Sequence, residues 1–468
     1  MGPSKNNRTI SQEAFEGLVK ENMEDLGMDP DEALQDAIET LTLQGVNLSG
    51  IVTCIPGSIN DNPVIQCLDR LRDIDLKMKY QEDDDDLSKA GYDEMGEILV
   101  KLKDMCSTEG SGNATIAVKN GGLDLVVLIC SKIQIRHEHC LVSALNALSS
   151  LIYDPSCTEI FRTNGGVKIV MNIMNDGGQN VSILNSAFSV VAAASTGNEV
   201  VKESFMELKI DEFLVKILSE NSKYSIPSAY DAIRILLTPD DGRVVASQVY
   251  GYARKFAEVG IAGVLVDSLH EGFSSPNLLS ACIALKAVAV NDEICRSIAD
   301  NGGINATFQC IEDSGEQNNK AVAKACCSLM SKLAGSDANK SAIVHMGGMD
   351  KLIKLSSRFS DDPLVLQEVM SIICVLCLRS PENAARAIEA GVGDFAIQSM
   401  QKFPAAQQMQ KQSCLMIRNL VARNPENRTI LLANGIEKII RKAKENHVSC
   451  KAAATDALRD LGLDNYNS

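Results

Sequence analysis

Two short motifs in this sequence have the residue types and spacing that could bind a metal ion. Cys374 and Cys377 have the spacing of half a zinc site, and residues 137–140 read His-Glu-His-Cys. A structural zinc ion needs four converging ligands. The chain has no second Cys-x-x-Cys pair, and its other histidines lie in distant segments. We therefore predict that the cysteine pair packs in a core, that residues 137–140 begin an exposed helix, and that the protein binds no metal.

Catalytic and cofactor motifs give no stronger signal. Residues 110–112 read Gly-Ser-Gly, but the Gly-Lys-Ser/Thr of a phosphate-binding loop does not follow them. The five histidines stand in no nucleophile–base pattern, so no acid–base pair can be named. We predict a protein that is not an enzyme and that uses no cofactor.

Composition and charge indicate an acidic chain with an aliphatic core. Apolar residues make up 45% of the 468 positions, aromatic residues only 4%, and Trp is absent. The formal net charge of −16 predicts repulsion of nucleic acids and of anionic membranes.

Cysteine usage and the absence of long apolar runs suggest a compartment. The 15 cysteines lie mostly in apolar runs and show no disulfide framework. No apolar run reaches the roughly 18 residues of a membrane helix, and no apolar signal segment begins the chain. These features predict a cytoplasmic or nuclear protein, or one found in both, without nucleic-acid or membrane partners.

A glycine-centred phrase recurs along the chain at a nearly constant interval. Successive glycines are 44, 95, 42, 45, 44 and 44 residues apart. The long interval contains one repeat without its glycine, near residues 208–210, and extra residues around 238–256. A period of about 40–47 residues is typical of helical solenoid repeats. The glycines that define the phrase are Gly121, Gly165, Gly260, Gly302, Gly347, Gly391 and Gly435.

Each repeat predicts three helices. A short apolar helix ends at the glycine, where the missing Cβ permits a sharp turn. A second apolar helix follows, and after a polar loop comes a longer helix with an Ala-Leu-x-x-Leu pattern, as in residues 457–461. One such unit cannot bury its apolar faces alone, so the units must stack.

The glycine turn, the Ala-Leu helix and links such as residues 380–383 and 424–427 resemble the armadillo repeat family. HEAT repeats are the main alternative, but they usually have two helices per unit, and this chain shows three. The resemblance covers roughly residues 88–468. It implies an all-α, armadillo-type right-handed superhelical solenoid.

The N-terminal part forms a helical extension. An amphipathic pattern predicts a helix over residues 10–26, and Asp29 and Pro30 suit the N-cap and first residue of a second helix that ends near Leu43. Residues 1–53 are predicted as an N-terminal helical segment. Residues 54–87 are predicted as a linker, a helix over 64–80 and a solvated acidic run at 82–86.

Both ends of the chain resemble one branch of the family more closely. Residues 10–15, 44–49 and 411–422 are similar to the armadillo repeat-containing protein 6 family. That resemblance implies an interaction role without catalysis. It identifies no site residues.

The resemblance also implies that the third helices line a concave groove. Import receptors with this fold place Trp and Asn there, but this chain has no Trp, and at the Asn positions only Asn419 fits. The preceding position carries Arg234, Lys286, Arg418 and Arg459. This pattern predicts a broken row of cations that anchor carboxylate or phosphate groups of a partner. The alternative is that each charge is solvated or paired locally.

A second candidate site is the segment that interrupts the repeat. Residues 240–243 read Asp-Asp-Gly-Arg, and Tyr250, Tyr252 and Phe256 follow closely in a chain that has few aromatic residues. Segments that interrupt a solenoid often bind partners. The alternative is a lengthened helix whose aromatic side chains complete the local core.

Together these features favour a scaffold or adaptor that binds an acidic or phosphorylated segment of another protein in its groove. An assembly chaperone would use the same groove, and a nuclear transport-type receptor is a further alternative that lacks its Trp and Asn ladder. Because solenoid repeats contact only their neighbours, we expect a monomer.

Overall fold

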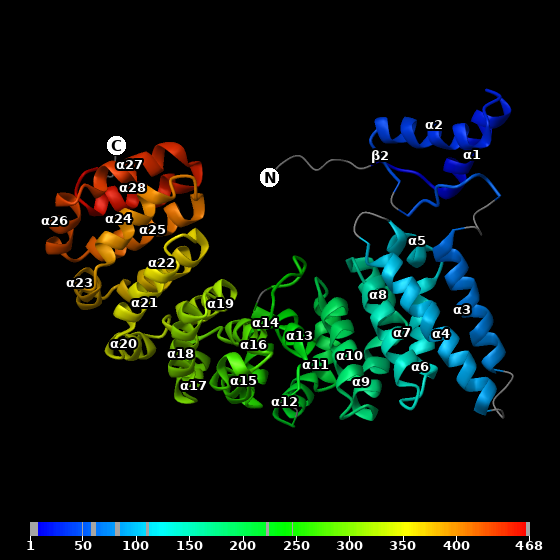
Figure 1. Cartoon of the computed structure of the whole chain (residues 1–468), viewed down its shortest axis with the longest axis horizontal. Coiled ribbons are helices and arrows are strands. Elements are labelled where there is room, and N and C mark those ends of the chain that lie inside the picture. Colours follow the sequence, from blue (N-terminus) through cyan, green and yellow to red (C-terminus); the bar gives the residue numbers. More distant parts are fainter. Residues whose placement is uncertain are drawn as a thin grey trace. The chain divides into compact units, whose positions relative to one another are not determined.

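The structure is a computed structural model that describes residues 8–48, 50–57, 62–79, 85–108, 112–220, 224–245 and 247–464. Within these ranges it is built almost entirely of α-helices, α1 to α28 (Figure 1). Two compact units make up the chain. Unit 1 comprises Met1–Phe213 with Asp231–Ala246, and unit 2 comprises Leu214–Tyr230 with Ser247–Ser468.

Helices α5 to α28 form eight successive sets of three, as the sequence predicts. The first helices are α5 (Asn113–Lys119), α8 (Pro155–Thr163), α11 (Glu199–Glu207), α14 (Ser247–Glu258), α17 (Asp292–Asp300), α20 (Asp337–His345), α23 (Pro381–Glu389) and α26 (Pro425–Ala433). The second helices are α6 (Gly122–Lys132), α9 (Gly166–Asp176), α12 (Ile210–Glu220), α15 (Ile261–His270), α18 (Gly303–Glu316), α21 (Gly348–Arg358), α24 (Val392–Lys402) and α27 (Ile436–Asn446). The third helices are α7 (Glu138–Leu151), α10 (Val181–Ser195), α13 (Pro227–Leu236), α16 (Leu278–Val288), α19 (Lys320–Leu333), α22 (Pro363–Cys377), α25 (Gln407–Val421) and α28 (Lys451–Asp460). The 3-10 helices η2 (Gly272–Ser274) and η3 (Val448–Cys450) precede α16 and α28.

The repeated glycine makes the turn between the first and second helices. All seven glycines of the phrase adopt left-handed backbone, with φ between 72° and 92°. A side chain disfavours this region, so glycine is the residue that fits it best. In the set without a glycine, Lys209 occupies the turn at φ 61°. The sequence interpretation of residues 208–210 as a repeat that lacks its glycine is therefore confirmed.

The second position of the Gly-Gly phrase needs glycine for a different reason, which is steric. A Cβ added to Gly166 would lie 2.3 Å from the ring of Phe161. One added to Gly348 would lie 2.6 Å from the carbonyl oxygen of Ile343. The first glycine is needed for its backbone conformation, and the second allows the two helices to approach closely.

Asparagines at one position of the first helices join the last repeats. Asn339, Asn383 and Asn427 are each the third residue of a first helix, and they are 44 residues apart. The Asn427 amide donates to the carbonyl oxygen of Leu420 at 2.9 Å and to that of Ala384, in the preceding first helix, at 3.0 Å. Asn339 makes the equivalent pair of bonds. The Leu420 carbonyl lies in the last turn of α25, where the backbone supplies few donors, and the bond to Ala384 joins adjacent first helices.

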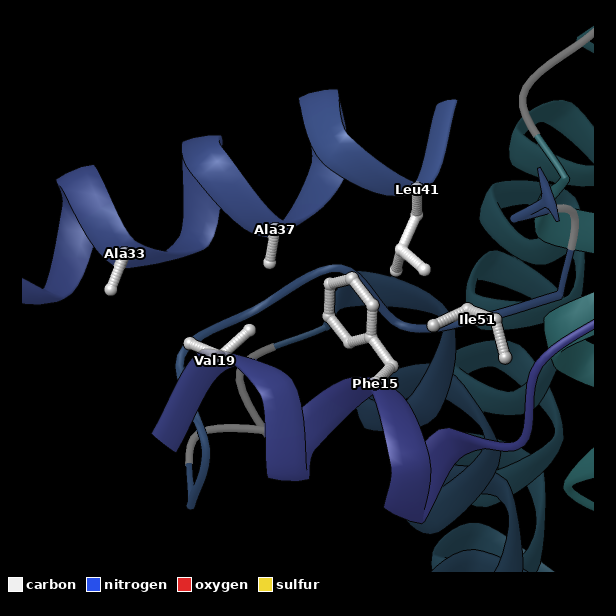
Figure 2. Packing of buried hydrophobic residues seen from close by; sticks show 6 residues of the cluster. All are labelled: Phe15, Val19, Ala33, Ala37, Leu41 and Ile51. Atoms are coloured by element: carbon white, nitrogen blue, oxygen red, sulfur yellow. The ribbon is translucent and has the colours of Figure 1, made fainter. Parts of the chain in front are cut away.

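The N-terminal extension has its own small core. Helices α1 (Gln12–Glu24) and α2 (Pro30–Leu43) pack face to face, with Asp29 as the predicted N-cap of α2. Figure 2 shows the buried side chains that meet between them. The short strands β1 (Arg8–Thr9) and β2 (Val46–Asn47) pair in parallel, which the sequence did not predict. This pairing joins the two ends of the extension, and the cluster comprises Phe15, Val19, Ala33, Ala37, Leu41 and Ile51.

Helices α3 (Pro63–Lys79) and α4 (Asp85–Cys106) cover the first repeat. α4 packs on α7 in the way that third helices pack on one another, and α3 packs on α4, α5 and α6. Of the predicted acidic break, Asp85 and Asp86 instead begin α4. Residues 82–84 lie outside the described residues. The predicted domain boundaries at 53 and 87 stay predictions.

Hydropathy identifies no single helix of the described segments that is long and apolar enough to cross a membrane. The consecutive helices α5 and α6 meet the length and composition requirements together, but they are bent by 76°.

Candidate partner-binding face on the third helices

The third helices of unit 2 pack side by side. Within this unit α16 contacts α19, α19 contacts α22, α22 contacts α25, and α25 contacts α28 (Figure 1). Each helix buries most of its aliphatic side chains and turns one stripe outward, which on α16 and α22 includes the exposed Leu279, Ile283 and Leu364. We call the outward stripes of these five helices the third-helix face.

The third-helix face is basic in an acidic protein. Its five helices carry eight basic and only three acidic side chains, a formal net charge of +5 against −16 for the chain. By contrast, the third helices α7, α10 and α13 carry two acidic side chains and one arginine. The basic residues are Lys286, Lys320, Lys324, Lys332, Lys411, Arg418, Lys451 and Arg459.

Most of these cations have no anionic partner among the described residues. Lys286 donates from Nζ to the Ser328 hydroxyl at 2.6 Å, across the α16–α19 contact. Lys320 pairs with Asp362 at 3.1 Å. The lysines that form no ion pair with a described residue are Lys286, Lys324, Lys332, Lys411 and Lys451.

The C-terminal end of the face is neutralised locally. Arg418 of α25 lies 3.2 Å from Asp456 and 3.4 Å from Asp460, both on α28. Arg459 contacts the same two carboxylates at 3.0 and 3.1 Å. Two arginines and two aspartates therefore form a balanced network, so an acidic partner would have to compete with these carboxylates.

Comparison with known proteins identifies a family. A family model described as ARMC6 matches residues 81–465, and the model of the armadillo repeat-containing protein 6 N-terminal domain matches residues 7–67. This chain belongs to the armadillo repeat-containing protein 6 family.

Relatives and solved structures agree with this assignment. Proteins named armadillo repeat-containing protein 6 from Pongo abelii and Homo sapiens are 26% and 25% identical, and each match covers 81% of this chain and 75% of the relative. The homolog from Drosophila melanogaster is 23% identical, with 82% of this chain and 80% of the relative covered.

Two solved structures show the same all-α solenoid fold. One is a structure whose title states that a conserved phosphorylation switch controls the interaction between cadherin and β-catenin. It has a TM-score of 0.58 at 15% identity, covering 87% of this chain and 81% of that chain. An engineered protein has a TM-score of 0.53 at 17% identity, covering 86% and 99%. The armadillo-type fold predicted from sequence is confirmed.

Two further predicted site residues of this armadillo repeat-containing protein 6 family member also have local partners. Arg234 lies in unit 1 and contacts Asp231 of its own helix at 3.3 Å. The Asn419 amide donates to the Cys374 carbonyl oxygen of α22 at 2.8 Å. That carbonyl lies in the last turn of its helix, where the backbone supplies few donors. Asn419 therefore bridges two third helices, and its role toward a partner stays a prediction.

The aromatic segment is mostly part of the core. Phe256 is fully buried and Tyr252 is 6% exposed, both in α14. Only Tyr250, at 47% exposure, can contact a partner without the helix moving. The alternative interpretation, that the aromatic residues complete the local core, describes Phe256 and Tyr252.

The polar residues that open the same segment hold unit 1 together. Asp241 accepts hydrogen bonds from the Glu199 backbone N–H and from the Arg243 side chain. Asp240 accepts from the buried Lys202 ammonium at 2.6 Å. This segment thus closes over the start of α11.

Of the predicted cysteine pair, Cys377 is buried in the core and Cys374 is only partly buried. Burial raises the pKa of the Cys374 thiol to about 11 and that of Cys377 further, so both are protonated at neutral pH and are poor ligands or nucleophiles. Residues 137–140 begin α7, with His137 as its N-cap. Among the described residues, no three His, Cys, Asp or Glu side chains are arranged to hold a metal ion.

Sequence reasoning missed five of the eight basic residues of the face. It followed one position per repeat, whereas a helix presents every third or fourth residue on the same side. Counting charge over each complete third helix would have found them, because the helices themselves were predicted. The missed residues are Lys320, Lys324, Lys332, Lys411 and Lys451.

Proposed function

We propose that this protein is a non-enzymatic scaffold or adaptor whose third-helix face binds an acidic segment of a partner protein. The observation that carries the proposal is the net charge of +5 on five stacked helices of a chain with net charge −16. Five lysines on this face have no anionic partner among the described residues. An acidic segment would supply the missing anions.

A protein segment fits this face better than a nucleic acid does. None of the five third helices contains Phe, Tyr or Trp, so the face has no aromatic platform on which bases could stack. The acidic remainder of the chain also repels a polyanion that extends beyond the face. A short acidic segment avoids most of that repulsion.

The same charge disfavours a receptor for basic import signals. Such a peptide would bring like charges onto the lysines, and like charges oppose association by up to several kcal/mol. An assembly chaperone would use the same face, and binding assays with an isolated peptide do not separate it from an adaptor.

The test uses the full chain and a fluorescein-labelled 15-residue peptide of alternating Glu and Ser. We expect the reversal Lys324→Glu/Lys332→Glu/Lys411→Glu to weaken binding more than 100-fold. Each exposed pair contributes about 0.5–1 kcal/mol, and each new glutamate adds a similar repulsion, which gives a loss of about 3 kcal/mol or more. Affinity measured by anisotropy should also fall with added salt.

A matched control changes the net charge equally on the second helices. Lys354, Lys438 and Lys442 are exposed residues of α21 and α27. Their triple reversal to Glu should change affinity by only a few fold. Equal losses in the two triple variants, or tighter binding of a Lys-rich peptide or a 15-nucleotide RNA than of the acidic peptide, would refute the proposal.

A further inference from the structure

An open cavity of about 500 Å³ lies in unit 2 between the first helices α20 and α23. Its walls come from these two helices, from Gly335 before α20 and from residues 378–380, which link α22 to α23. This volume is within the range of about 300–1,000 Å³ that is common for ligand sites. The cavity lies outside the third-helix face, so the two sites can be tested independently.

Three cations line the cavity. Lys340 is 9% exposed, and its Nζ lies 2.9 Å from Asp337 Oδ1 and 3.4 Å from the Leu378 carbonyl oxygen. An ammonium group has three protons, so these two contacts leave one donor unused. Arg379 and Arg386 are exposed, and neither forms an ion pair with a described residue.

The carboxylates at the cavity do not balance these cations fully. Asp337 is held by Lys340, and its pKa lies below the ordinary value because of the hydrogen bond from Lys340, the charge of Lys340 and the charge of Arg379. Glu382 lines the cavity too and is its other acidic residue. Two arginines therefore face one uncommitted carboxylate.

The N-terminus of helix α23 lies at the cavity. Helix α23 begins at Pro381, and the side chain of its N-cap, Ser380, caps no backbone N–H. Glu382 and Asn383, in the first turn of α23, line the cavity. The positive end of the helix dipole thus adds to the three cations at the same place.

We propose that this cavity binds a phosphate monoester, with Arg379 and Arg386 as the main contacts and Lys340 as a third. Two guanidinium groups can each donate paired hydrogen bonds to phosphate oxygens, a geometry that suits a dianion better than a single carboxylate. The same chemistry is presented by a phosphorylated serine of a peptide and by a free phosphate compound.

Calorimetric titration of the full chain separates these two sources. The probes are sodium phosphate, a nine-residue phosphoserine peptide flanked by Gly and Ala, and the same peptide with serine. We expect at least the phosphopeptide to bind, and the serine peptide to bind at least tenfold more weakly. Binding of inorganic phosphate as well would indicate a site for free phosphate compounds, whereas binding of the phosphopeptide alone would indicate a phosphorylated partner.

Substitutions assign the binding to this cavity. Arg379→Gln/Arg386→Gln should weaken phosphate binding at least tenfold, and Glu382→Gln should strengthen it several fold because a competing carboxylate is removed. Arg254→Gln is the control, since Arg254 is an exposed residue of α14 that does not line the cavity. Circular dichroism should show unchanged helicity in all three variants. The proposal is wrong if neither phosphate probe binds, or if the double variant binds as tightly as the parent protein.

Discussion

The buried lysine of unit 1 offers the sharpest test of the structure. Lys202, the fourth residue of α11, is 0% exposed. Its Nζ lies 2.5 Å from the Thr238 carbonyl oxygen, 2.6 Å from Asp240 Oδ1 and 3.5 Å from Glu199 Oε2. Lys202→Met retains most of the side-chain volume and removes the charge with all of its hydrogen bonds. The substitution therefore tests the network rather than the packing.

The expected cost follows from burial. Removal of one partner of a buried ion pair costs about 3–5 kcal/mol, because the remaining charge is left without compensation. Glu199 is 2% exposed and cannot recover its hydration, but the Asp240 side chain is 24% exposed and can do so in part. We therefore expect a loss near the lower limit, about 3 kcal/mol, which corresponds to roughly 150-fold in the local opening equilibrium.

Native-state hydrogen exchange measures this loss where it occurs. The chain has two compact units, so a single global transition is a poor measure of one of them. Amides of α11 should exchange roughly 150-fold faster in Lys202→Met, whereas those of α26 in unit 2 should be unchanged.

Lys340 provides the matched control. It is the fourth residue of α20, but its partner Asp337 has a side-chain exposure of 96% and its contact with the Leu378 carbonyl oxygen is longer, at 3.4 Å. Lys340→Met should therefore cost less than about 1 kcal/mol in α20. Similar losses in the two variants, or a loss below about 1 kcal/mol for Lys202→Met, would refute the assignment of a buried, energetically important network.

Three further predictions concern a turn with left-handed backbone, a close contact between helices and the protonation of a carboxylate. Lys209→Gly should raise the free energy of unfolding of unit 1 by about 0.5–1 kcal/mol, because glycine adopts φ 61° without strain. The urea midpoint of unit 1 should rise accordingly, and a lower midpoint would contradict this. Gly348→Ala should destabilise unit 2 by about 1–3 kcal/mol, since its Cβ would meet the Ile343 carbonyl oxygen at 2.6 Å; exchange of α21 amides checks it, and an unchanged rate would be the contrary result. The hydrogen bond from Arg243 lowers the pKa of Asp241 well below the ordinary value. The stability that this carboxylate contributes is therefore complete above about pH 4, and it is lost as the pH falls toward the lowered pKa of the folded protein. Urea midpoints of unit 1 should therefore decline below about pH 4, and less steeply in Asp241→Asn; equal slopes for the two proteins would disprove the linkage.

The fold could be predicted because its signals are local. A turn at φ 72° or more needs glycine, whichever helices surround it, so Gly165 and Gly347 reveal their turns directly. Asp29 and Pro30 likewise mark the start of α2 through bonds that span two residues. Even the degenerate turn at Lys209 could be located, because the period of the neighbouring repeats fixed its place.

The candidate sites depended on contacts between repeats. The sequence placed Arg418 and Asn419 on the third helix of their repeat, but not the carboxylates of α28 or the carbonyl oxygen of α22 that they contact. Nor did it show that Lys202 is buried, because its partner Asp240 lies 38 residues away in a segment outside the regular period.

The sequence by itself thus determined the three-helix repeat, its turns and the positions of its charged residues along each helix. Only the tertiary structure decided which of those charges are neutralised and which remain available to a partner. The physical reason is one of distance along the chain: a turn or a cap is set by forces between residues a few positions apart. The partner of a long charged side chain is set by how two helices some 40 residues apart pack together.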